Sequence, residues 1–117
     1  METILQKWKQ TQENEFSLAE KYYSLLSAMN SLQLTEREIQ LVAFTAVKGN
    51  ISNVNVRTEF ISLHEGTSGP TINNIISKLK KKNIFIKENG KVKVNPKIVL
   101  DFKNNIIINI SLEHETK

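Results

Sequence analysis

Apolar residues recur with a helical period over most of the chain and with an alternating period after that. The helical spacing covers the segments 16–30, 35–49, 55–64 and 70–82, and it predicts a helix in each of them. An apolar run followed by two charged residues over 84–88, and alternating lysine and valine over 91–94, then predict two short strands. Asn89-Gly90 lies between these runs and is the strongest short signal of a β-hairpin. The pattern therefore predicts an α+β fold with about four helices followed by a hairpin.

Capping signals predict where these helices begin. Ser17 with Glu20, and Thr35 with Glu38, have the spacing of capping boxes, in which two side chains satisfy backbone N–H groups. Ser68 can cap the helix 70–82 through its hydroxyl. Apolar side chains cover most of the surface of the helix 35–49, so we expect this helix to lie at the centre of the core.

The helix 70–82 has one apolar and one polar face. Ile72, Ile75, Ile76 and Leu79 fall at the positions i, i+3, i+4 and i+7, and they predict a buried stripe. Hydrogen-bonding side chains followed by lysines occupy the opposite face and its flanks: Thr71, Asn73, Asn74, Ser77, Lys78 and Lys81. Exposed helix faces are usually only solvated, so a binding role for this face depends on what surrounds it.

The pattern after Pro96 is less regular. Residues 97–103 fit either a short helix or a strand, whereas Ile106–Leu112 predicts a strand whose even-numbered residues are all apolar. Such a strand must be covered, either within the chain, by the N-terminal arm for example, or by a second copy. The expected organisation is an N-terminal arm or short strand over 1–15, a folded domain over 16–103, and a C-terminal strand and tail over 104–117.

Positive charge is concentrated in one part of the chain. Residues 67–103 contain nine lysines and two acidic residues, a net charge of +7, whereas 1–66 and 104–117 sum to −2 and −1. Isoleucine, lysine and asparagine supply 41 of the 117 residues, a bias that AT-rich codons produce, so the frequency of lysine is not informative by itself. Its position is informative, because a localised basic segment indicates a polyanionic partner.

The sequence gives little support to disulfides, metal binding, enzymatic activity or membrane insertion. The chain has no cysteine, and His64 and His114 are far apart, so neither disulfides nor a metal site is expected. It has no Ser-His-Asp pattern and no glycine-rich phosphate loop, so we expect neither an enzyme nor a bound cofactor. No stretch approaches the roughly 20 apolar residues that span a bilayer, and the first residues do not resemble a signal peptide. A cytoplasmic protein that does not enter a membrane is expected.

The predicted order of elements is that of a winged helix-turn-helix: a helix, a turn with glycine, a second helix with a polar outer face, and an Asn-Gly hairpin. The stretch Thr71–Ile84 (TINNIISKLKKKNI) resembles the recognition helix and wing entry of MarR-type regulators, and Leu34-Thr35-Glu36 resembles the start of a helix in that family. Small phage and plasmid winged-helix proteins share this layout. The resemblance covers 34–96 and implies that 16–103 is a winged helix domain. MarR wings usually carry an Asp-x-Arg pair, which this hairpin lacks.

The resemblance implies that the protein binds double-stranded DNA as a small transcriptional or replication regulator. The helix 70–82 would enter the major groove, where asparagine can pair bidentately with adenine, and the hairpin 84–94 would act as the wing. Two such modules bound to two half-sites imply a homodimer, and Ile106–Leu112 is one segment through which the two copies could associate. The residues that would contact DNA are Ser68, Thr71, Asn73, Asn74, Ser77, Lys78 and Lys81 of the helix, and Lys87, Asn89, Lys91 and Lys93 of the wing.

Two other functions stay open on the sequence alone. A winged helix can act as a protein-interaction module in a larger assembly such as a replisome, polymerase or virion, and an apolar outer face on the helix 70–82 would indicate that role. Binding of RNA or single-stranded DNA needs exposed aromatic residues near the basic segment, where only Phe85 lies. The lysines also have structural explanations, since they can stabilise a helix end or block an edge strand.

Overall fold

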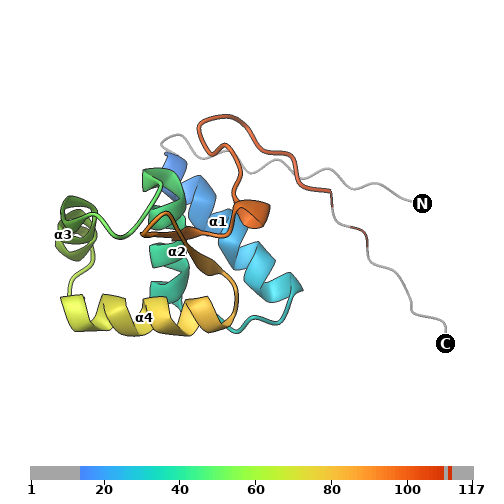
Figure 1. Cartoon of the computed structure of the whole chain (residues 1–117). Helices are drawn as coiled ribbons and strands as arrows, with labels where there is room; N and C mark the ends of the chain where they lie inside the picture. Colours follow the sequence, from blue (N-terminus) through green and yellow to red (C-terminus); the bar gives the residue numbers. More distant parts are fainter. Residues whose placement is uncertain (1–13, 110, 112–117) are drawn as a thin grey trace.

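The computed structural model describes residues 14–109 and 111 (Figure 1). The predicted α+β class is confirmed for this part of the chain, which contains four α-helices and one antiparallel hairpin and is compatible with a winged helix. In chain order, the elements are α1 (Glu15–Met29), α2 (Glu36–Lys48), α3 (Val54–Leu63), α4 (Gly69–Lys81), β1 (Phe85–Glu88), β2 (Lys91–Val94) and the short 3₁₀ helix η1 (Pro96–Ile98).

Helix α2 lies at the centre of the fold, as its apolar surface predicts. Leu41, Val42 and Ala43 are fully buried, and α2 packs against α1, α3 and β2. Helix α4 packs against α3 and β1, and it runs along the lower edge of the molecule in Figure 1. One hydrophobic core therefore joins the four helices to the inner face of the hairpin.

Two of the predicted helix starts are confirmed. The Thr35 hydroxyl accepts a hydrogen bond from the Glu38 N–H at 3.2 Å, and the Glu38 carboxylate accepts one from the Thr35 N–H at 2.8 Å, which completes the capping box of α2. Ser68 caps α4 by accepting a hydrogen bond from the Thr71 N–H at 3.3 Å. These caps satisfy N–H groups that the first turn of a helix leaves without partners.

The predicted start of α1 is wrong by one turn. Asn14 is the cap, and its side-chain oxygen accepts a hydrogen bond from the Ser17 N–H at 2.9 Å, so Ser17 lies inside the helix. Both residue types are good caps, and tertiary packing decides between them, because the longer helix brings Phe16 onto the ring of Phe44 at 5.3 Å between centroids. Residues 1–13 of the predicted N-terminal arm lie outside the described residues.

The hairpin forms where the sequence predicts it. Phe85 is paired with Val94, and Glu88 with Lys91, so the turn contains only Asn89 and Gly90. Both turn residues have positive φ angles, 53° and 75°, as in the tight turns whose twist matches that of the strands. The register places Phe85 and Val94 on the buried face of the hairpin.

The loop between α2 and α3 is hydrogen-bonded to the hairpin. The Ile51 N–H donates to the Val92 carbonyl at 2.9 Å, and the Val92 N–H donates to the Ser52 hydroxyl at 2.8 Å. These bonds satisfy backbone groups on the side of β2 that faces away from β1. The loop therefore covers part of an edge that would otherwise be unpaired.

The C-terminal strand is not formed in the described residues. Residues 99–109 contain no strand, although Ile106 packs against the core, and residues 110 and 112–117 lie outside the described part of the chain. The segment 97–103, for which a helix or a strand was expected, is irregular after η1. Tyr23 on α1 explains this path, because its hydroxyl donates to the Ile98 carbonyl at 2.7 Å and its ring packs on Phe102. These contacts direct the chain along α1 and away from the hairpin, so its backbone meets no strand to pair with.

Candidate nucleic-acid interface

Helix α4 has one buried apolar face and one exposed polar face, as its sequence predicts. The stripe of Ile72, Ile75, Ile76 and Leu79 is buried in the core. Among the described residues, none of the large apolar side chains that are exposed belongs to α4. The opposite surface is polar and then cationic, and its exposed residues are Asn73, Asn74, Ser77, Lys78 and Lys81, while Thr71 is half-buried.

The polar residues at the start of α4 are engaged in capping. The Ser68 and Thr71 hydroxyl oxygens lie 2.9 Å apart, and the Ser68 hydroxyl also accepts the Thr71 N–H. A ligand of Ser68 would have to share its hydroxyl with the cap. The first role of Ser68 is therefore to fix the direction in which α4 begins.

Asn73 has a partner that the sequence did not reveal. One guanidinium nitrogen of Arg57 on α3, Nη1, donates to Asn73 Oδ1 at 2.7 Å, and Arg57 Nε donates to the Ile51 carbonyl at 2.8 Å. Helical periodicity cannot predict this contact, because it joins two helices. Composition holds the one available signal, since Arg57 is one of two arginines in a chain with fourteen lysines.

Lys78 is held by a buried carboxylate. Its Nζ lies 3.2 Å from Oε2 of Glu38, whose side chain is 4% exposed whereas that of Lys78 is 54% exposed. Burial raises the pKa of Glu38, but the hydrogen bond from the Thr35 backbone and the hydrogen bond and charge of Lys78 outweigh this effect and hold the pKa below its usual value. A phosphate bound by Lys78 would share its ammonium group with this carboxylate, which already neutralises much of its charge.

Three of the residues of α4 that were predicted to contact DNA are free to bind a ligand. Asn74, Ser77 and Lys81 are exposed, and their side chains make no hydrogen bond or ion pair within the described part of the chain. Asn74 and Ser77 lie three positions apart on a helix, and Ser77 and Lys81 lie four apart, so the three residues share one side of α4. This side therefore offers uncharged hydrogen-bonding groups followed by a cation.

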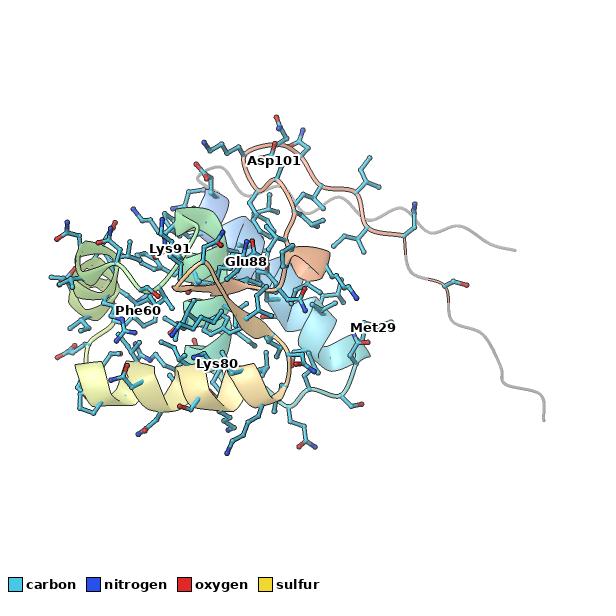
Figure 2. All side chains as sticks on the ribbon, viewed as in Figure 1. Met29, Phe60, Lys80, Glu88, Lys91 and Asp101 are labelled. Atoms are coloured by element: carbon cyan, nitrogen blue, oxygen red, sulfur yellow. The ribbon has the colours of Figure 1, made fainter. Side chains whose placement is uncertain are left out.

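The hairpin contributes two further unpaired cations. Lys87 and Lys91 are exposed and have no ion-pair partner among the described residues, whereas Lys93 Nζ lies 2.8 Å from Oε1 of Glu88. Figure 2 labels Lys91 and Glu88 at the hairpin tip, where Asn89 adopts the positive φ of the turn. Lys93 is thus neutralised within the hairpin, and Lys87 and Lys91 supply its available charge.

The last turn of α4 contains lysines with different surroundings. Lys82 Nζ donates to the Leu32 carbonyl at 2.7 Å, which ties the end of α4 to the loop before α2. Lys80, labelled on α4 in Figure 2, is exposed and lies where a cation stabilises the carbonyl end of a helix.

Phe85 is the aromatic residue of the hairpin, and it was the one candidate for stacking on a base. Its side chain is only 1% exposed and lies in the hydrophobic core. A buried ring offers no surface on which a nucleic-acid base could stack. The geometry of the hairpin therefore gives no support to binding of RNA or single-stranded DNA.

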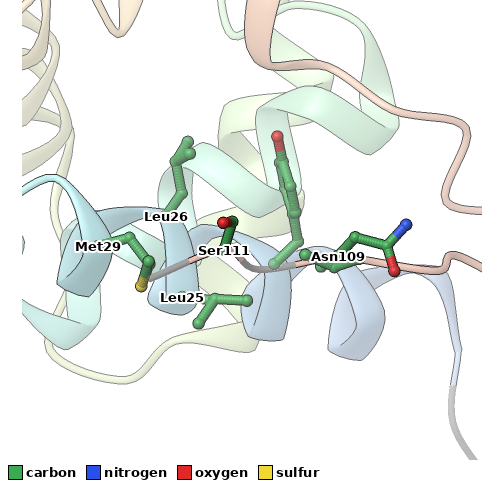
Figure 3. A pocket seen from close by; sticks show the side chains of 7 residues that line it. Leu25, Leu26, Met29, Asn109 and Ser111 are labelled. Carbon is green, nitrogen blue, oxygen red and sulfur yellow. The ribbon is translucent and has the colours of Figure 1, made fainter. Parts of the chain in front are cut away.

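A separate apolar hollow lies along α1 (Figure 3). Tyr22, Leu25, Leu26 and Met29 line one side, and residues 108, 109 and 111 of the C-terminal segment line the other. Its volume is about 230 Å³, below the roughly 300–1,000 Å³ of small-molecule sites. The hollow is open and mainly apolar, which is typical of packing between surfaces and not of a site for a polar ligand.

Comparison with known proteins adds no assignment, because no family model, curated protein or solved structure matches this chain. Within residues 14–109 and 111, no helix is long and apolar enough to cross a membrane. The same residues contain no group of three or more histidine, aspartate or glutamate side chains that could hold a metal ion. Any functional assignment therefore depends on the geometry of α4 and the hairpin.

Proposed function

We propose that the protein is a winged helix-turn-helix protein that binds double-stranded DNA, as a small transcriptional or replication regulator. One observation carries the proposal: the outer side of α4 is polar and cationic, without a large exposed apolar side chain, and the hairpin that follows adds unpaired lysines. A surface of this kind suits the acceptor-rich major groove and its flanking phosphates. It is a poor match for a protein-interaction module, whose contact surface would need apolar residues at its centre.

The contacts of each side chain suggest different roles on DNA. Asn74 and Ser77 can offer hydrogen bonds to base edges, because neither has a hydrogen-bond partner among the described residues, and Lys81 can neutralise a phosphate beside the groove. Lys87 and Lys91 can bind phosphates at the wing. The other predicted contacts have a role in the fold first. Ser68 and Thr71 cap α4, Lys78 and Lys93 form ion pairs, and Asn89 forms the hairpin turn.

A homodimer is part of this proposal. A single helix-turn-helix module covers one half-site, and a second module bound one helical turn away increases the affinity and the length of the sequence that is read. Ile107 and Ile108 are 84% and 44% exposed, and Met29 at the end of α1 is 48% exposed, so the C-terminal segment and α1 form one apolar surface available for association. Sedimentation velocity of the wild type and Ile107→Lys tests this route, because loss of a dimer in the variant is expected.

Fluorescence anisotropy over a salt series tests the main proposal. A labelled AT-rich duplex of about 30 base pairs should bind with an affinity whose logarithm falls linearly with the logarithm of salt concentration, because bound lysines displace counterions from phosphates. A single strand of the same sequence is the matched ligand, and the buried Phe85 predicts weaker binding to it. Absence of duplex binding at low salt would overturn the proposal and favour a protein partner.

A further inference from the structure

Arg57 and Asn73 form a defined pair on the side of α4 that faces α3. Arg57 comes from α3 and is fixed at two points, because Nε donates to the Ile51 carbonyl at 2.8 Å and Nη1 donates to Asn73 Oδ1 at 2.7 Å. Asn73 is exposed, and its amide nitrogen has no partner among the described residues. The pair is therefore rigid on its protein side and open on its solvent side.

The chemistry of arginine fixes the orientation of the asparagine amide. A guanidinium group has only donors, so the atom of Asn73 that faces Arg57 must be the oxygen, and the amide nitrogen must point elsewhere. Hydrogen bonds from a charged donor are about twice as strong as neutral ones, so the amide cannot turn over without losing a strong bond. Asn73 is thus held with its two N–H donors available and with one lone pair of its oxygen bound to the cation of Arg57.

If Ser77 lies in the major groove of a bound duplex, Asn73 lies there as well. The two residues are four positions apart on α4, which brings them to neighbouring positions on the same side of the helix. Both are exposed, and the large apolar side chains of α4 lie on the other face. A duplex that contacts Ser77 in the major groove therefore also meets the amide of Asn73 and the remaining N–H groups of Arg57.

We propose that Arg57 and Asn73 act as one base-reading unit that presents hydrogen-bond donors to the duplex and selects guanine over adenine at the base pair it faces. This inference rests on the proposed DNA-binding function. Guanine shows two acceptors in the major groove, O6 and N7, which match a donor-rich, positively charged pair. Bidentate pairing with adenine requires the asparagine oxygen to accept from N6. One of the two lone pairs of that oxygen is already used by Arg57 at 2.7 Å, and the positive charge of the guanidinium beside it disfavours the approach of the adenine amino group.

The inference changes the expected role of Asn73. Asparagine considered alone favours adenine, because its amide offers one donor and one acceptor side by side. Asn74, next in the chain and without a partner within the described residues, keeps both groups available. The two asparagines of α4 should consequently read different bases.

Selection of bound sequences from a randomised duplex library tests the proposal position by position. The wild type should prefer guanine at one base pair, and Asn73→Asp, which keeps the acceptor for Arg57 but removes both donors, should reduce the guanine-to-adenine ratio there by roughly 10-fold. Repulsion between the added negative charge and the phosphates weakens binding to every duplex and cancels in this ratio, whereas its repulsion of guanine O6 and N7 lowers the ratio further. Arg57→Ala releases the asparagine oxygen and should shift the preference at the same base pair toward adenine.

Asn105→Ala is the matched control, since Asn105 is exposed, lies outside α4 and has no hydrogen-bond partner within the described residues. Its base preferences should equal those of the wild type. Thermal unfolding of every variant confirms that the compared proteins are folded, and Asn73→Asp keeps the contact with Arg57 if Arg57→Ala fails to fold.

Two results would overturn the inference while the proposed function stands. In one, Asn73→Asp and Arg57→Ala weaken all duplexes equally with unchanged base ratios, as expected of a phosphate contact. In the other, the wild type prefers adenine at the base pair that responds to Asn73→Asp. Failure of the proposed function is a different result, because the wild type would then show no salt-dependent binding to any duplex, and the inference would fall with it.

Discussion

Lys78 on α4 and Glu38 on α2 form an ion pair, with 3.2 Å between Nζ and Oε2. The other carboxylate oxygen of Glu38 accepts the Thr35 N–H at 2.8 Å, so one buried side chain both caps α2 and holds α4. The position of the candidate recognition helix is therefore linked to the start of the central helix. Breaking this link should alter stability before it alters any direct contact with DNA.

Glu38→Gln should lower the free energy of unfolding by about 1 kcal/mol at neutral pH, because it removes the charge while leaving an oxygen for the cap. The pKa of Glu38 is lowered in the folded protein, so its stabilising contribution is present above the pKa of the unfolded chain, about 4.3, and is lost as pH falls through the folded pKa. Urea unfolding at about pH 7 and pH 3 should show the difference between the two proteins shrinking in acid. Glu36→Gln, at an exposed position of the same turn, is the control. A difference that does not change with pH would contradict the assignment.

Alanine at Lys81, Lys87 or Lys91 should weaken duplex binding at all sequences. Each variant should reduce the slope of log affinity against log salt by about 0.9 if the replaced lysine neutralises one phosphate. The three side chains are exposed and have no partner within the described residues, so these changes should leave stability within about 0.5 kcal/mol of the wild type. Fluorescence anisotropy over a salt series measures the slope.

Lys103→Ala is the control for these lysine variants. Lys103 is also exposed, but it follows Asp101, which Figure 2 shows at the end of the molecule away from α4. If Lys103→Ala reduces the salt slope as much as Lys81→Ala does, binding reflects overall charge, and α4 and the hairpin have no special role.

Gly90→Ala should destabilise the hairpin by about 1 kcal/mol, because Gly90 has a φ of 75° and a Cβ atom is unfavourable in the left-handed region. Weaker duplex binding with unchanged helical circular dichroism is the expected result if the hairpin contacts DNA. Gly69→Ala is the matched control, since Gly69 is in the first turn of α4, has no positive φ and has open space around an added Cβ. This control should be neutral or stabilising by up to about 1 kcal/mol.

Tyr23→Phe should reduce stability by about 1 kcal/mol or slightly more, because it removes the 2.7 Å hydrogen bond to the Ile98 carbonyl at a side chain that is 1% exposed. Burial also raises the pKa of Tyr23, so its hydroxyl remains a donor through the neutral and mildly alkaline range. Amide hydrogen exchange should become faster after residue 98, because the variant no longer ties this segment to α1. Tyr22→Phe, whose hydroxyl has no hydrogen bond to the described residues, should leave this exchange unchanged.

Features that depend on a few neighbouring residues could be predicted from the sequence. The Thr35–Glu38 capping box, the cap at Ser68 and the Asn89-Gly90 turn all join residues no more than three positions apart, so their geometry is set by the local backbone. The buried stripe of α4 was also predictable, because a period of 3.6 residues with isoleucine or leucine at each position fits one environment. These local signals placed every helix to within about one turn.

Features that depend on tertiary neighbours could not be predicted in this way. An isoleucine-rich run has the pattern of a strand, but a strand needs an edge to pair with, and the contacts of Tyr23 and Phe102 direct the chain along α1. Some side-chain contacts in the candidate site also depend on tertiary neighbours. Lys78 and Asn73 remain predicted DNA contacts. Their partners within the protein, Glu38 on α2 and Arg57 on α3, could not be predicted, because they lie at distances along the chain that no periodicity encodes.

The hydrogen bond between Val92 and Ile51 helps to connect the hairpin and α4, the two surfaces proposed to bind DNA. The Val92 carbonyl binds the Ile51 N–H, the Ile51 carbonyl binds Arg57 Nε, and Arg57 Nη1 binds Asn73. Three successive hydrogen bonds thus run from the hairpin to the exposed side of α4, through the backbone of Ile51 and the side chain of Arg57. The hairpin and the Asn73 amide are therefore held in a defined relative orientation by direct hydrogen bonds as well as by packing.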